Sequence, residues 1–181
     1  MPPSPQEARA ALFSAIVLCL LGSFGILFGH AQTSRSADPP GLANYLEMIE
    51  SRIPAERPAA EKFYRAQWDS DARRPLGWSN VVVSAMLIVG GLMIVGRRKN
   101  TLWWIKNSIA ANLVQVAGQA YDHFRIIASL DDVPVHVVTH MQASVIVDVT
   151  LKVIVYVGAL MLVLRKTVRA FLASEGPPRP A

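Results

Sequence analysis

The stretch SVIVDVTLKVIVYVGALMLVL, residues 144–164, is apolar over about 20 residues, the length with which a helix crosses the hydrocarbon core of a membrane. Two further runs, residues 11–29 and 81–96, contain no charged residue. Across the chain 52% of the residues are hydrophobic and the mean hydropathy is +0.32, which is too apolar for an ordinary soluble domain. The sequence therefore predicts an all-α integral membrane protein.

A fourth span is predicted over residues 102–121, although this segment is more polar than the other three. Its polar residues include Lys106, Asn107, Asn112, Gln115 and Gln119. Positive residues beside the spans accumulate on the cytoplasmic side of a membrane. Residues 97–101 and the tail 165–181 are both basic. If residues 102–121 form a span, two spans separate these basic segments, and both lie on the cytoplasmic side.

The predicted topology is a four-transmembrane-helix bundle with both termini cytoplasmic and a small extracytoplasmic helical cap between spans one and two. The loop after span three carries three acidic residues against one basic residue, which favours the outside. In chain order the segments are a cytoplasmic N-terminus (1–10), span one (11–29), the cap (30–78), span two (79–96), a basic loop (97–101), span three (102–121), an extracytoplasmic loop (122–142), span four (143–164) and a cytoplasmic tail (165–181). The expected location is a bacterial inner (plasma) membrane.

Span one has an alternative interpretation as a secretory signal peptide. Gly29, His30 and Ala31 follow the apolar run in a small-x-small pattern that resembles a cleavage site. Cleavage there would leave three spans and an external N-terminus. The run 11–29 is longer than the usual apolar core of a signal peptide, which favours a retained span.

The cap, residues 30–78, contains seven acidic and seven basic residues and hence has no net charge. Apolar residues at helical spacing predict an amphipathic helix from Leu42 to Ile53, with Asp38 as its N-cap. A second helix is predicted to begin near Pro58, with aromatic residues on one side. The two helices could pack on each other and on the ends of the spans, lie in the outer headgroup layer, or bind a partner subunit.

Asp148 and Lys152 lie four residues apart inside span four, so a helix brings them onto one face as a possible ion pair. A charge inside a membrane costs at least about 2.5–3.5 kcal/mol and faces a bundle interior, water or a partner. The pair could couple to a proton or ion, recognise another helix, or simply orient span four toward span three.

A polar stripe is predicted on span three, because its polar residues recur every three or four positions. The stripe consists of Ser108, Asn112, Gln115, Gln119 and Asp122. Such a face avoids lipid, and it could either hydrogen-bond the neighbouring spans or line a hydrated path. Together with the ion pair, it makes spans three and four the expected functional core.

His136 and His140 are the candidate metal ligands of the chain. Pro134 could start a helix that places the two imidazoles one turn apart, with Asp131 and Asp132 nearby. The motif is weak, because it lacks the glutamate of a zinc hydrolase signature and the cysteine pair of a c-type haem site. Interfacial histidines without a ligand are the expectation, and no cofactor is predicted.

Small residues at Gly25 and Gly29, and at Gly90 and Gly91, match helix-contact patterns and favour helix packing or homo-oligomerisation. Cys19 is the only cysteine, so neither an internal disulfide nor a multi-cysteine metal site can form. The net charge of +5 lies beside the spans, which does not favour nucleic acid as a partner.

The sequence predicts no enzyme, because it contains no nucleotide loop, nucleophile elbow or carboxylate pair in a soluble segment. The first functional hypothesis is a non-enzymatic subunit or scaffold of a membrane complex, with the lipid bilayer and partner subunits or further copies of the chain as its neighbours. The second is a small oligomeric ion or solute transporter or channel that uses the polar faces of spans three and four. The third is a metal- or haem-binding redox protein.

Overall fold

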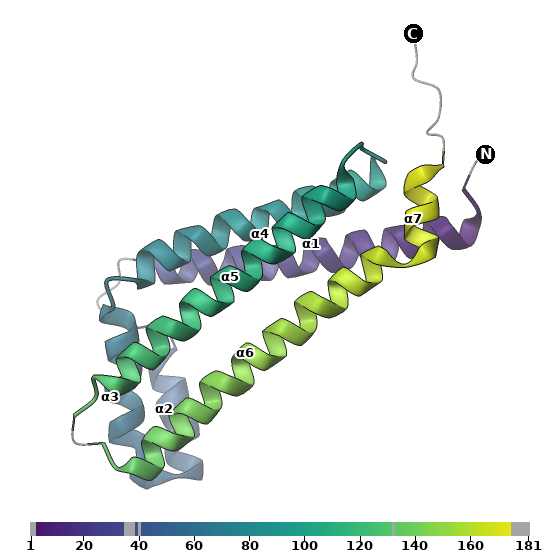
Figure 1. The fold of residues 1–181 in the computed structure, drawn as a ribbon. Helices are drawn as coiled ribbons and strands as arrows, with labels where there is room; N and C mark the ends of the chain where they lie inside the picture. Colours follow the sequence, from purple (N-terminus) through teal and green to yellow (C-terminus); the bar gives the residue numbers. More distant parts are fainter. Residues whose placement is uncertain (1–2, 35–38, 40, 132, 175–181) are drawn as a thin grey trace.

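The computed structural model describes residues 3–34, 39, 41–131 and 133–174, and within them only helices form (Figure 1). Arg52 and Ala55 are described by their backbone alone. The described residues contain seven α-helices and one short 3-10 helix, and no strand. In chain order they are α1 (Pro5–Thr33), α2 (Leu42–Arg52), η1 (Pro54–Glu56), α3 (Arg57–Asp69), α4 (Arg73–Val95), α5 (Thr101–Ala128), α6 (Val135–Leu164) and α7 (Lys166–Ala173). The prediction of an all-α protein is confirmed.

Among the described residues, three helices rather than the predicted four are long and apolar enough to cross a membrane: α1, α4 and α6. The predicted span 102–121 does form one continuous helix, α5, of 28 residues. Its length is sufficient for a crossing, but its composition does not qualify, because amide, hydroxyl and charged side chains interrupt the apolar residues. By length and composition, the prediction is therefore supported for three spans.

Helix α1 begins earlier than the predicted span because its N-terminus is capped. The backbone N–H of Glu7 donates to Ser4 Oγ at 3.3 Å, and the N–H of Ser4 donates to Glu7 Oε2 at 2.8 Å. Pro5 occupies the first turn, where its missing N–H is harmless. This reciprocal cap satisfies donors that the end of a helix otherwise leaves free.

The closest helix contact lies between α1 and α4, and it is built from glycines. A Cβ added at Gly29 would lie 2.7 Å from the carbonyl oxygen of Gly77, and one at Gly22 would lie 2.6 Å from that of Ser84. On the opposite helix, a Cβ at Gly91 would lie 2.8 Å from Cys19 Sγ. The small-residue pattern of span one therefore serves packing within the chain.

Helix α5 packs on α4, and α6 packs on α5, as Figure 1 shows in green and yellow-green. Helices α6 and α1 diverge toward the end that carries α2 and α3, and they approach each other near α7. At the α7 end of the bundle lies a buried group of side chains, here termed the apolar cluster. Its members are Ala11, Ala15, Leu18, Leu87, Ile94, Ile105, Ile109, Ala159, Val163 and Phe171.

The cap helices, α2, η1 and α3, pack on each other and on the ends of α5 and α6. The rings of Tyr45 and Tyr64 stack with centroids 5.1 Å apart. Lys62 Nζ donates to the carbonyl oxygen of Asp131 at 2.6 Å. Helix α2 begins after Gly41, whose φ of +80° suits glycine, while the predicted N-cap Asp38 lies outside the described residues.

The segment predicted as a tail, residues 165–181, contains a further helix that the sequence analysis missed. Val168 and Phe171 of α7 are buried against the N-terminal part of α1. The guanidinium carbon of Arg97 lies 4.4 Å from the centroid of the Phe171 ring. Helix α7 thus joins the α4–α5 turn and the beginning of α1 at one end of the molecule.

Replacing Gly25 by valine is expected to lower the thermal unfolding temperature in detergent, because its side chain would collide with Ser84 across the α1–α4 contact. Overpacking of this kind costs about 1–3 kcal/mol. Gly158→Val on α6 is the matched control, since nothing lies within 4 Å of a Cβ at that position. Equal unfolding temperatures for the two variants would contradict the glycine contact.

Candidate functional site

Asp148 and Lys152 form the ion pair that their spacing suggests, with Lys152 Nζ 2.6 Å from Asp148 Oδ2. The side chains are 50% and 40% exposed, respectively, although the pair lies in the middle of an apolar helix. Tyr156, one turn further along the same face, donates its hydroxyl to Asn112 Oδ1 of α5 at 3.1 Å. The charged face of α6 is therefore directed toward α5, and it is not tightly covered.

Most of the polar stripe on α5 is used to hold α4. Asn112 Nδ2 donates to the carbonyl oxygen of Val83 at 2.9 Å. Ser108 Oγ lies 3.3 Å from the carbonyl oxygen of Met86 in α4 and 2.8 Å from that of Trp104 in its own helix. Gln115 follows the same pattern: its Nε2 donates to the carbonyl oxygen of Leu76 at 2.7 Å, and its Oε1 accepts from the Ser79 hydroxyl. These three side chains are buried against the protein, whereas Lys106 and Asn107 near the start of α5 are exposed.

The last two members of the stripe differ from the first three. Asp122 is buried, accepts from Ser70 Oγ at 3.0 Å and pairs with Arg125 at 2.9 Å. Gln119 lies one turn after Gln115 on α5, and its side chain lines two cavities. The structure thus brings the stripe and the ion pair together, but only part of the stripe faces open space.

The central cavity, about 410 Å³ in volume, lies between α1, α4, α5 and α6. Its wall on α1 is mainly apolar, with Phe24 and Phe28, and ends at Gln32. Its other polar lining residues are Asn80, Asn112, Gln115, Gln119, Asp148, Lys152 and Tyr156. Apolar walls with a few convergent polar groups and a volume of this order are typical of small-molecule sites.

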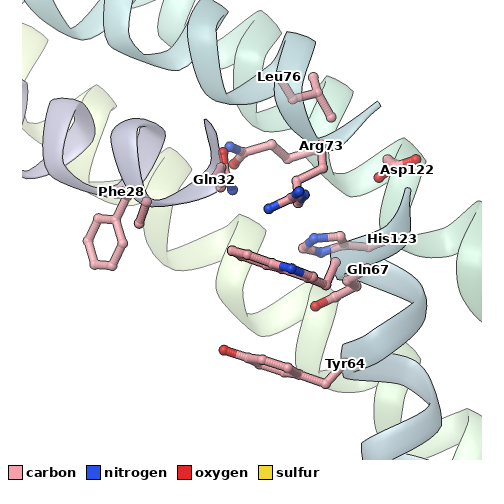
Figure 2. Close-up of a pocket in the computed structure, with 11 residues that line it drawn as sticks. Phe28, Gln32, Tyr64, Gln67, Arg73, Leu76, Asp122 and His123 are labelled. Atoms are coloured by element: carbon pink, nitrogen blue, oxygen red, sulfur yellow. The ribbon is translucent and has the colours of Figure 1, made fainter. Parts of the chain in front are cut away.

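A second cavity of about 430 Å³, here termed the cap cavity, lies where α3 meets the ends of α1, α4 and α5 (Figure 2). It shares Phe28, Gln32 and Gln119 with the central cavity, so the two adjoin. Figure 2 shows Arg73 reaching between Gln32 and His123. The sequence analysis did not single out this arginine, because it lies in a run of mixed charge that is typical of a solvated segment.

His123 is a second residue that the sequence analysis did not single out. It lines the cap cavity and a smaller cavity of about 170 Å³ that reaches Asp148. Its ring meets that of Phe63 edge to face, with centroids 6.3 Å apart. His123 follows Gln119 by four residues, so it continues the helical period of the stripe, and that period could have identified it. It lies just beyond the predicted span 102–121.

Burial lowers the pKa of His123, and the positive charge of Lys152 lowers it further, against the opposing effects of Asp122 and Asp148. The neutral imidazole is therefore the favoured form in the folded protein. A neutral ring carries one donor and one acceptor, which suits a half-buried position between two cavities.

His136 and His140 lie in the first turns of α6, whose N-cap is Pro134, as the sequence analysis suggested. His140 Nδ1 lies 3.1 Å from Glu56 Oε1 of the cap, so this imidazole has a carboxylate partner. Among the residues that the structure describes, which exclude Asp132, no group of three or more potential ligands could hold a metal ion. The metal hypothesis stays a prediction.

Comparison of the chain with models of known protein families, with curated proteins and with solved structures finds no match.

Asn112 joins three helices, so Asn112→Ala is expected to destabilise the fold by about 1–2 kcal/mol, a few membrane hydrogen bonds. Unfolding in mixed micelles, followed by circular dichroism, measures this loss. Asn107→Ala is the matched control, because Asn107 is exposed and donates to Trp103 of its own helix at 2.8 Å. Similar losses in both variants would exclude the three-helix role of Asn112.

The stability of the protein is expected to fall on acidification partly through His123. Its folded-state pKa lies below the ordinary value of 6.5, so its stabilising contribution is complete above about pH 6.5 and is lost as the pH falls. His123→Gln should therefore show a smaller decrease in unfolding temperature between pH 7.5 and pH 5.5 than the wild type. His136→Gln, at an exposed position, serves as control, and a wild-type slope in His123→Gln would refute the assignment.

Proposed function

We propose that the chain crosses a bacterial inner membrane four times, with α5 as the additional span and both termini cytoplasmic. The burial of Ser108, Asn112 and Gln115 against α4 supports this topology, because the polar side of α5 is not offered to lipid. The basic α4–α5 turn and α7 lie at the same end of the molecule as the N-terminus (Figure 1), as the positive-inside rule requires of cytoplasmic segments.

Within that topology, we propose that the protein binds a small polar solute in the central cavity, in the manner of a transporter. The single observation that carries this proposal is that the ion pair of α6 faces the stripe of α5 across open space. A purely structural ion pair would be closed over by its neighbours, yet both side chains are about half exposed. Water or a polar solute is a more favourable neighbour for these charges than lipid.

The shape of the cavity supports entry from the cap end. The apolar cluster fills the bundle at the α7 end with tightly buried side chains such as Leu18, Leu87 and Ile109. The central cavity adjoins the cap cavity at the opposite end. Full passage of a solute would require the apolar cluster to separate, so in the proposed orientation the pathway is closed on the cytoplasmic side.

The subunit hypothesis remains a second candidate, and the broad apolar surface of α6 favours it. Ile146, Leu151, Ile154 and Met161 are each more than half exposed. A helix of a partner protein seated between α1 and α6 would cover this surface and the ion pair together. Lipid covers the outer part of such a surface equally well, so the content of the central cavity distinguishes the two functions.

Cysteine accessibility is the experiment that separates them. In a Cys19→Ser background, Leu151→Cys places a thiol in the central cavity and Ile154→Cys places one outside it, at nearly equal exposure, 58% and 61%. A charged, membrane-impermeant thiol reagent reacts with thiolates, which form in water and not in hydrocarbon. In proteoliposomes we expect Leu151→Cys to react at least about tenfold faster than Ile154→Cys.

The same labelling in native membranes completes the test. Rapid labelling of Leu151→Cys in both preparations supports a solute-binding cavity. Rapid labelling in proteoliposomes with protection in native membranes supports a partner that fills the cavity. Equally slow labelling at both positions in proteoliposomes would show that the cavity is not hydrated, and the solute-binding proposal would fail.

A further inference from the structure

The cap cavity contains an arginine whose hydrogen-bonding groups are not used. Nε and Nη1 of Arg73 are buried, and within the part of the chain that the structure describes they have no hydrogen-bond partner. The guanidinium lies over the Trp68 ring, with its carbon 3.7 Å from the ring centroid. Stacking fixes the plane of the guanidinium but leaves its N–H groups directed into the cavity.

Buried donors without partners are unfavourable, and those of a charged group especially so. The acid that lines the same cavity does not relieve Arg73, because Asp122 already pairs with Arg125 and accepts from Ser70. The other charged groups close to Arg73 in the sequence are Asp69, Asp71 and Arg74, and among the described residues no ion pair joins Arg73 to either acid. The adjacent Nε–H and Nη–H groups of a guanidinium form a fork that matches two oxygens of a carboxylate or phosphate.

A second unsatisfied group lies in the same cavity. Gln32 Oε1 is buried and lacks a hydrogen-bond donor. Figure 2 shows Gln32 beside Arg73, and Phe28, one turn earlier on α1, lines the same cavity. The cavity thus presents donors for an oxyanion next to an acceptor for an N–H or O–H group.

The surroundings point to a ligand that is also apolar. Phe28, Leu76 and Tyr64 form much of the lining, and Phe28 is 67% exposed toward the side where α1 faces lipid. The cavity lies at the ends of two candidate spans, near Thr33 of α1 and Arg73 of α4, which is the depth of lipid headgroups. A headgroup can therefore reach Arg73 while its acyl chains stay beside α1.

We infer that the cap cavity binds a phospholipid whose phosphate oxygens accept hydrogen bonds from the Arg73 guanidinium, its buried Nε–H among the donors, and whose headgroup donates a hydrogen bond to Gln32 Oε1. An ethanolamine or glycerol headgroup has such a donor, whereas choline has none. The inference rests on the proposed membrane topology and concerns a cavity that adjoins the central cavity and shares Gln32 with it, so lipid binding and solute binding are measured separately.

The test uses the full chain in non-ionic detergent, with binding measured by isothermal titration calorimetry. The probes are dioctanoyl phosphatidylethanolamine, dioctanoyl phosphatidylcholine and inorganic phosphate. The two lipids have the same net charge and differ in the N–H donors of the headgroup. We expect the ethanolamine lipid to bind more tightly than either other probe, and Arg73→Gln to weaken it about tenfold, as loss of a charge-assisted hydrogen bond does.

Three further variants test the position of the charge, the geometry of the guanidinium and the role of Gln32. Arg74→Gln is the matched control, because it removes the same charge from the neighbouring, exposed position of α4 and should leave binding unchanged. Arg73→Lys keeps the charge without the fork and should bind with intermediate affinity. Gln32→Leu should remove the preference for ethanolamine over choline while retaining binding to Arg73.

Each contrary outcome overturns a defined part of the inference. Wild-type affinity in Arg73→Gln, or equal losses in Arg73→Gln and Arg74→Gln, would eliminate Arg73 as the phosphate ligand. Inorganic phosphate that binds as tightly as the lipid would exclude a lipid as the specific ligand. Equal affinity for the two lipids would exclude the donor to Gln32. Circular dichroism and gel filtration of every variant separate these outcomes from misfolding.

Discussion

The structure depends on the close approach of the α1 and α4 backbones. Glycines on both helices remove the side chains that would separate them, so that Gly29 and Gly77 meet carbonyl to Cα. Helix association in membranes relies on such packing, because apolar side chains gain little by leaving lipid. With one face of α4 closed in this way, its carbonyl oxygens on another face remain available to the stripe of α5. Helix α6 then attaches through α5 and the apolar cluster, and the space left beside α1 becomes the central cavity.

The stripe of α5 and the ion pair of α6 satisfy their polar groups in different ways. Asn112 and Gln115 satisfy their amides with carbonyl groups that already belong to a helix, so they add hydrogen bonds without leaving others broken. Asp148 and Lys152 satisfy each other within one helix and remain half exposed. The first arrangement fixes two helices together, whereas the second keeps a dipolar pair accessible. Arg73 follows neither pattern, which is why it stands out in the fold.

The sequence predicts the features that lie within one helix. The period of 3.6 residues is enough to anticipate the long helices, the ion pair of α6 and the shared face of Ser108, Asn112 and Gln115. It does not determine which neighbour each face meets, so the cavities and the isolation of Arg73 emerge only from the packing. Helix α7 was missed for another reason: it is short, and Val168 and Phe171 become informative only when α1 and the α4–α5 turn lie beside them. By composition α5 is the most polar of the four long helices, and only the structure shows that Ser108, Asn112 and Gln115 are buried against α4.

Helix α6 contacts the rest of the protein near both of its ends, so a tilt about one end would displace the other. One end of α6 is held in the apolar cluster by the buried residues Ala159 and Val163. Near the other end, His140 contacts Glu56 of the cap. With a rise of about 1.5 Å per residue, Asp148 lies about 22 Å from Val163, so a tilt of about 5° would displace it by about 2 Å. The cap contacts α6 beyond Asp148, as counted from the apolar cluster, so such a tilt would displace the cap end of α6 further than the charged pair. The width of the central cavity would then change together with the position of the cap.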